Sequence, residues 1–129
     1  VKILIEPLNA NDNPEYFLTT AAQANALLTR ANHDNLFLQY DLYHAGMNGE
    51  NVIDGARTYL DIIDHMQMAG VPERNEPDTG TVDMLAAFDA IDVLGYKGWI
   101  GAEYRPSRST AESFTWGNPY GIGPRAPSS

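Results

Sequence analysis

The 129-residue chain contains no cysteine, so it can form no disulfide, zinc-thiolate site or thiol nucleophile. Basic residues are also scarce, because eight Lys and Arg stand against seventeen Asp and Glu, for a formal net charge of −9. This charge repels polynucleotides and anionic lipid surfaces, so neither is expected as a partner. No apolar run approaches the roughly 20 residues that span a bilayer, and no signal-peptide pattern is seen. These absences predict a soluble, cytoplasmic protein.

The length predicts one domain with a real hydrophobic core, although an eight-stranded α/β barrel is usually about twice as long. No internal repeat and no interdomain linker interrupt the chain. Residues 118–129 are rich in Gly, Pro and Ser and contain little that could pack. We therefore expect a folded domain over residues 1–117 and a flexible C-terminal tail over residues 118–129.

Hydrophobic periods of two and of 3.6 residues alternate along the domain. They predict strands at residues 1–6, 35–40, 62–68 and 99–104, and helices at residues 20–31, 51–60 and 82–94. Gly95 ends the third helix, and a short last helix is expected to start at Ser109 or Thr110. Four repeated βα units indicate an α/β fold with a parallel sheet, equivalent to half of a (β/α)8 barrel.

Each predicted strand ends on a side chain that can bind a metal ion: Glu6, Asp41, Gln67 and Glu103. Parallel sheets gather their chemistry at the carboxyl ends of the strands, so we expect the four side chains to converge on one point. Oxygen ligands of this kind suit a hard divalent cation such as Mg²⁺ or Mn²⁺.

Taken singly, these residues have ordinary structural explanations. A glutamate before a proline is usually a solvated strand end, and a lone Asp41 could cap a loop. A strand glutamine such as Gln67 is more often a surface residue than a ligand. His44 and His65 alone are more often hydrogen-bonded structural side chains, and Arg74 alone would be a solvated loop cation. The joint pattern is what favours a metal site.

Five segments in order carry a resemblance to a known family. They are LIEPLN at 4–9, LQYDLYH at 38–44, HMQMAGVPER at 65–74, LGYKGWIG at 94–101 and EYRP at 103–106. Over residues 3–116 the chain resembles the carboxyl-terminal half of hydroxypyruvate isomerase, within the xylose-isomerase-like TIM barrel superfamily. One departure is Asn75, which stands where that family commonly has a histidine.

The resemblance implies an eight-stranded barrel whose last four strands carry the divalent metal. It implies Glu6, Asp41, Gln67 and Glu103 as metal ligands, the two glutamates also being the acid/base pair. His44 and Arg74 occupy positions that line the family's substrate pocket. A substrate carboxylate needs a cation, for which Arg74 is the first candidate and Arg105, two residues beyond Glu103, is the second.

Three functions remain open at this point. The first is a metal-dependent aldose–ketose isomerase, an intramolecular oxidoreductase, that converts hydroxypyruvate to tartronate semialdehyde through an enediolate. The second is an isomerase or epimerase of a larger sugar or sugar acid. The third is a truncated, metal-binding half barrel without activity. A half barrel would expose two sheet edges and a bare apolar interior, which favours a homodimer that completes the barrel.

Overall fold

The computed structural model describes residues 1–123 and is built on a four-stranded parallel sheet in the order β1-β2-β3-β4. The strands are β1 (Ile3–Ile5), β2 (Leu36–Asp41), β3 (Ile63–Met68) and β4 (Ile100–Ala102). The helices are α1 (Ala21–Ala31), α2 (Leu42–Met47), α3 (Val52–Thr58), α4 (Met84–Leu94) and α5 (Thr110–Ser113), with 3₁₀ turns η1 (Leu60–Ile62) and η2 (Phe114–Tyr120). The predicted α/β class with four βα units is confirmed.

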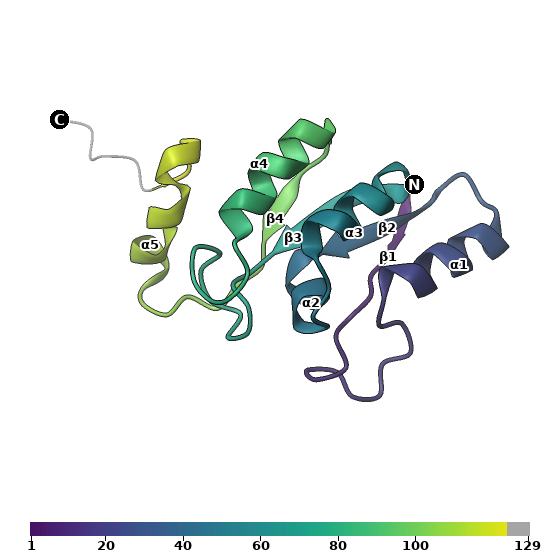
Figure 1. Cartoon of the computed structure of the whole chain (residues 1–129), viewed down its shortest axis with the longest axis horizontal. Coiled ribbons are helices and arrows are strands. Elements are labelled where there is room, and N and C mark those ends of the chain that lie inside the picture. The colour runs from purple at the N-terminus through teal and green to yellow at the C-terminus, as the bar shows by residue number, and fades with distance from the viewer. Residues whose placement is uncertain (124–129) are drawn as a thin grey trace.

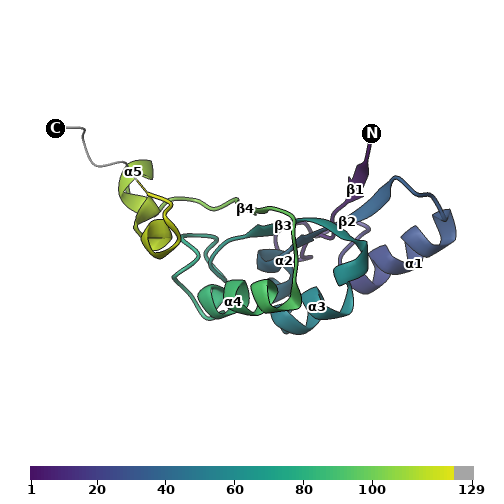
Figure 2. The ribbon, with the colours of Figure 1, turned by 90° about the horizontal axis from the view of Figure 1, so that it is seen from above.

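The long helices lie on one side of the sheet. Figure 2 shows α1, α3 and α4 side by side along that side, and Figure 1 shows α5 at the end of the molecule away from β1. The core forms where the helices meet the sheet, around Leu38, Tyr40 and Met66, which are at most 2% exposed. Ala24 and Ala56 are fully buried opposite these residues, and their small side chains let the helices approach the sheet closely.

The structure corrects the predicted bounds at several ends. The first and last strands are shorter than predicted because Val1 and Trp99 are exposed and lie outside the sheet. The predicted last helix begins where expected, with the Ser109 side chain at its N-cap. The sequence analysis missed α2, which starts directly after β2 with Asp41 as its N-cap residue. A six-residue helix is too short to show a hydrophobic period.

Within the part of the chain that the structure describes, Figure 2 shows no helix against the opposite face of the sheet, and polar side chains lie on this face beside the aromatic ring of Phe37. Lys2 and Asp64 form an ion pair of 2.6 Å there, with the Lys2 ammonium 5.0 Å from the centre of the Phe37 ring. Gln39 and His65 are paired across β2 and β3, next to a register irregularity that leaves Asp64 as an extra residue in β3. Alternation is interrupted there, so Asp64 and His65 lie on the same side although they are consecutive. Since side chains alternate along a strand, the residues next to these, such as Leu38 and Met66, point to the helices instead.

The predicted C-terminal tail overlaps the described structure only in part. Residues 118–120 belong to η2, and residues 124–129 of the predicted tail lie outside the described residues. The division into a domain at 1–117 and a tail at 118–129 therefore stays a prediction. Among the helices of residues 1–123, none combines the length and the hydropathy that a membrane span requires.

Candidate metal and substrate site

The fold brings the four predicted ligands to one edge of the sheet. Asp41 ends β2 and is paired in register with Gln67 on β3, while Glu6 follows β1 and Glu103 follows β4. The Glu6 carboxylate is close enough to those of Asp41 and Glu103 for each to raise its pKa. The four strand ends lie at one edge because the four strands are parallel and neighbours in space. That the four side chains bind one metal ion stays a prediction.

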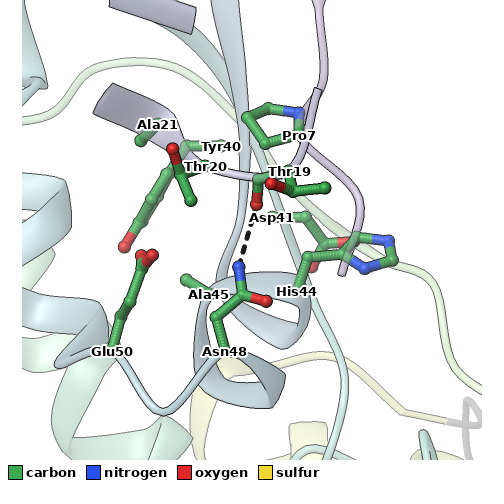
Figure 3. A pocket seen from close by; sticks show the side chains of 10 residues that line it. All are labelled: Pro7, Thr19, Thr20, Ala21, Tyr40, Asp41, His44, Ala45, Asn48 and Glu50. Carbon is green, nitrogen blue, oxygen red and sulfur yellow. Dashed lines mark hydrogen bonds and ion pairs between the residues drawn. The ribbon is translucent and has the colours of Figure 1, made fainter. Parts of the chain in front are cut away.

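A tighter cluster lies within this edge. One ligand atom each from Glu6, Asp41 and His44 lie within 4.8 Å of one another. Asp41 and His44 are both 3% exposed, and Figure 3 shows them side by side at the junction of β2 and α2. The junction fixes their relation, because Asp41 Oδ1 accepts a hydrogen bond of 2.9 Å from the backbone N–H of Tyr43 in the first turn of α2.

The carboxylates of the cluster are unfavourably placed as anions. Burial raises the pKa of Glu6 from 4.5 to about 7, and the charges of Asp41 and Glu103 add to the effect. Burial also raises the pKa of Asp41 from 3.8 to about 6, against the hydrogen bond from Tyr43 N–H and the charge of Arg74. A divalent cation would relieve this repulsion, so the donor set fits the predicted Mg²⁺ or Mn²⁺.

Gln39 belongs to the site and was missed in the sequence analysis. Its Nε2 donates a hydrogen bond of 2.5 Å to Gln67 Oε1, and a further hydrogen bond to Glu6 partly lowers the Glu6 pKa. Gln39 thus connects candidate ligands from β1 and β3. Its position two residues before Asp41 on the same strand face was a signal that could have identified it.

His44 is held from behind by Asn9, which the sequence analysis also missed. Asn9 N–H donates a hydrogen bond of 3.0 Å to His44 Nδ1, and burial lowers the pKa of His44 to about 4. The imidazole is therefore neutral at pH 7, and the 3.8 Å approach of Nε2 to Asp41 Oδ2 is not a salt bridge. His65 remains two residues before Gln67, on the same face of β3, with Nε2 near the Gly101 backbone.

Arg74 lies beside the carboxylates of the site. Its Nη2 is 3.1 Å from Glu103 Oε2, and its guanidinium carbon is 4.8 Å from the centre of the Tyr43 ring. These two contacts hold a planar guanidinium beside the carboxylates, where its remaining N–H groups can bind an anion.

Arg105 has an exposed side chain, and its backbone forms two hydrogen bonds. Its N–H donates to Arg74 O at 2.6 Å, and its carbonyl oxygen accepts a bond of 2.8 Å from Asn75 Nδ2. The Asn75 amide, which stands where the similar family commonly has histidine, therefore ties the loop after β3 to the segment after β4.

The comparisons with known proteins agree with this geometry. The model of the xylose isomerase-like TIM barrel family matches residues 1–120. A 2-oxo-tetronate isomerase of Cupriavidus necator is 41% identical over 120 residues, which are 93% of this chain and 46% of that protein. A hydroxypyruvate isomerase of Escherichia coli is 36% identical over 120 residues, with the same shares of 93% and 46%.

A solved structure matches the same share of this chain as the two relatives do. The crystal structure of AP endonuclease, family 2, from Brucella melitensis superposes with a TM-score of 0.89 at 35% identity, over 93% of this chain and 46% of that one. The chain spans about half the length of the curated relatives it matches. The assignment of this half to the carboxyl-terminal side of those relatives stays a prediction.

Proposed function

The chain belongs to the xylose isomerase-like TIM barrel family, and on that premise we propose that it carries the metal and proton-transfer groups of an isomerase of small 2-oxo acids. The interconversion of hydroxypyruvate and tartronate semialdehyde is the reaction that we favour. The observation that carries the proposal is the gathering of Glu6, Asp41, Gln67 and Glu103 at the carboxyl edge of the sheet. The names of the relatives at 41% and 36% identity support the substrate class.

The metal site that we propose is formed by Glu6, Asp41, Gln67 and Glu103. Three carboxylates and one amide oxygen are donors typical of Mg²⁺ and Mn²⁺. When bound, the cation would polarise the substrate carbonyl and stabilise the negative charge that develops on its oxygen. Gln39 supports the set, because its hydrogen bond to Gln67 Oε1 fixes the orientation of that amide.

Glu6 and Glu103 are the groups that we propose move the proton. In the favoured reaction the hydrogen on C3 of hydroxypyruvate leaves as a proton, an enediolate forms, and a proton returns to C2 while the hydroxyl proton passes from O3 to O2. One carboxylate takes the first proton, and the conjugate acid of a carboxylate supplies the second. The Glu6 pKa of about 7 is suitable for both roles near neutral pH.

Three side chains are proposed to orient the substrate. Arg74 is restrained by the Tyr43 ring and by Glu103, so it can bind a substrate carboxylate with little loss of side-chain freedom. Arg105 is the second candidate for the same carboxylate. His44 faces the cluster with Nε2 and can contact a substrate oxygen.

The test is isomerisation of hydroxypyruvate in D₂O, followed by ¹H NMR. One sample contains Mg²⁺ or Mn²⁺, and in a parallel sample EDTA removes the metal ion. We expect metal-dependent conversion with deuterium entering the product, and Glu103→Gln should reduce kcat at least about a hundredfold, the usual size for loss of a general acid or base. Glu15→Gln, at an exposed position, is the matched control. Conversion that persists in EDTA or in Glu103→Gln would contradict the proposal.

A second substrate deserves the same assay. The 41% identity to a 2-oxo-tetronate isomerase favours a four-carbon 2-oxo acid as the alternative to hydroxypyruvate. Larger sugars and sugar acids follow as a third group, and the kcat/KM values rank them. The net charge of −9 gives no support for action on a nucleic acid, the substrate that the name of the Brucella protein suggests.

We also propose that a second copy completes the barrel when the chain is alone. β1 and β4 form the two edges of the described sheet, and an apolar groove lies beside the β4 edge. Its lining includes Met68, Phe88, Ile100 and Trp116. Light scattering behind size exclusion should give the mass of a dimer that Mn²⁺ tightens, and a monomer at all concentrations would contradict this proposal.

A further inference from the structure

The environment of His44 determines which of its ring nitrogens carries the proton. His44 is 3% exposed, and the residue behind it, Asn9, is fully buried. The backbone N–H of Asn9 lies 3.0 Å from His44 Nδ1. A backbone N–H can only donate, so Nδ1 must accept and cannot itself carry a proton.

The side chain of Asn9 gives the same answer independently. Its Oδ1 accepts a hydrogen bond of 2.9 Å from the backbone N–H of Asp12, which fixes the orientation of the amide. The Asn9 Nδ2 group therefore faces His44 Nδ1 at 2.8 Å and Asp12 Oδ2 at 3.1 Å. Tyr43 also donates its hydroxyl proton to Asp12 Oδ2, at 2.5 Å, which keeps Asp12 in place. Two donors thus converge on one imidazole nitrogen.

A neutral imidazole has one proton, so with Nδ1 accepting the proton is on Nε2. This Nε2 is the nitrogen that faces the carboxylate cluster, 3.8 Å from Asp41 Oδ2. A distance of 3.8 Å is too long for a hydrogen bond, so the N–H is free to meet another acceptor. A nitrogen that carries a proton has no lone pair in the ring plane for a metal ion, although His44 lies within the 4.8 Å cluster.

We propose that Asn9 is a positioning residue that holds His44 in the Nε2–H tautomer, so that His44 donates a hydrogen bond to a substrate oxygen and does not bind the metal. This inference rests on the proposed function for the identity of the acceptor, an oxygen of the 2-oxo acid. A donor at this point stabilises the oxygen as negative charge develops on it during enediolate formation.

The first test reads the tautomer directly. The chain is labelled with ¹⁵N-histidine, and two-bond ¹H–¹⁵N correlations are recorded at pH 7 with and without Mg²⁺, which is diamagnetic. We expect His44 Nε2 to be protonated and Nδ1 unprotonated in both samples. A proton on Nδ1, or a transfer of the proton from Nε2 to Nδ1 when Mg²⁺ is added, would overturn the proposal, because the second result is that of a metal-bound Nε2.

The second test reverses the polarity of the contact. Asn9→Asp keeps the size of the side chain and replaces the side-chain donor to Nδ1 by an acceptor, while the backbone N–H of residue 9 still donates to Nδ1. We therefore expect part of the His44 population to carry its proton on Nδ1 instead of Nε2. Asn48→Asp is the control, because Asn48 connects the end of α2 to the loop between β1 and α1. Its Nδ2 donates a hydrogen bond of 2.9 Å to Thr19 O, which Figure 3 marks with a dashed line. The control should leave the His44 signals unchanged. An unchanged ratio of the two His44 tautomers in a folded Asn9→Asp variant would overturn the role of the Asn9 side chain.

The tautomer result does not depend on turnover, so it separates this inference from the proposed function. If no 2-oxo acid is converted but Nε2 carries the proton, the proposed function fails and the positioning by Asn9 stands. Where the wild type is active, Asn9→Asp should lower kcat about tenfold, the value of one hydrogen bond made in the transition state, with KM changed less. An equal loss in Asn48→Asp would assign the effect to general loosening of the loop and contradict the proposal.

Discussion

Removing the charge of Glu6 should stabilise the metal-free protein and weaken its binding of a divalent cation. The folded state raises the pKa of Glu6 from 4.5 to about 7, first through burial and then through Asp41 and Glu103. A carboxyl with a raised pKa binds its proton more tightly in the folded state. Its contribution to stability is therefore full below about pH 4.5 and is lost as the pH rises through about 7.

The size of the effect follows from the shift. Each pKa unit corresponds to about 1.4 kcal/mol, and Glu6 is partly exposed, so screening by solvent leaves about 1 to 2 kcal/mol at pH 8. The neutral Gln in Glu6→Gln has no such penalty. We expect the metal-free variant to unfold at a temperature about 3 to 10 °C higher than the wild type at pH 8, and at nearly the same temperature at pH 4.

The assay is thermal unfolding followed by circular dichroism in EDTA and in Mn²⁺ at both pH values. In Mn²⁺ the order should reverse at pH 8, because the wild type gains more binding energy from its extra anionic ligand. Glu15→Gln controls for the loss of one surface charge. The reasoning would be refuted if Glu6→Gln lowered the unfolding temperature in EDTA at pH 8, or if Mn²⁺ stabilised both proteins equally.

Three further outcomes are expected. Gln39→Leu removes the hydrogen bond that orients the Gln67 amide on β3, and Mn²⁺ affinity measured by calorimetry should fall about tenfold; an unchanged affinity would show that Gln39 does not support the site. Arg74→Lys loses the planar fork and the contact with the Tyr43 ring, so KM for a 2-oxo acid should rise about tenfold with kcat less affected; an unchanged KM would show that Arg74 does not bind the substrate carboxylate. Gly55→Ala places a methyl group against the Tyr40 hydroxyl, so denaturant unfolding should show a free energy of unfolding lowered by about 1 to 3 kcal/mol. An unchanged free energy of unfolding would contradict this.

The strand ends were predictable because they obey a local rule. A run of apolar residues that stops at Glu6 or Asp41 shows both the strand and its last side chain, and the βα order makes the strands parallel. Gln39 could have been predicted by the same rule, since it lies on the Asp41 face of β2. The four predicted ligands therefore required no knowledge of contacts between distant residues.

The support for His44 could not be predicted in this way. Asn9 is 35 residues away in sequence and lies in a loop without periodicity, so only the folded chain shows that it contacts Nδ1. The ion pair on the open face of the sheet was equally beyond prediction. Lys2 directly precedes β1 and Asp64 lies near the start of β3, 62 residues away, so their pairing depends on the register of three strands.

The central claim is that Glu6, Asp41, Gln67 and Glu103 hold one divalent cation, and a Mn²⁺ titration followed by electron paramagnetic resonance tests it most directly. Free Mn²⁺ gives a sharp signal that disappears on binding, so the titration gives both stoichiometry and affinity. The account predicts one site per chain in the wild type, weakened at least about tenfold in Gln67→Leu and in Glu103→Gln and unchanged in Glu73→Gln. No binding by the wild type, or equal binding by all four proteins, would contradict it.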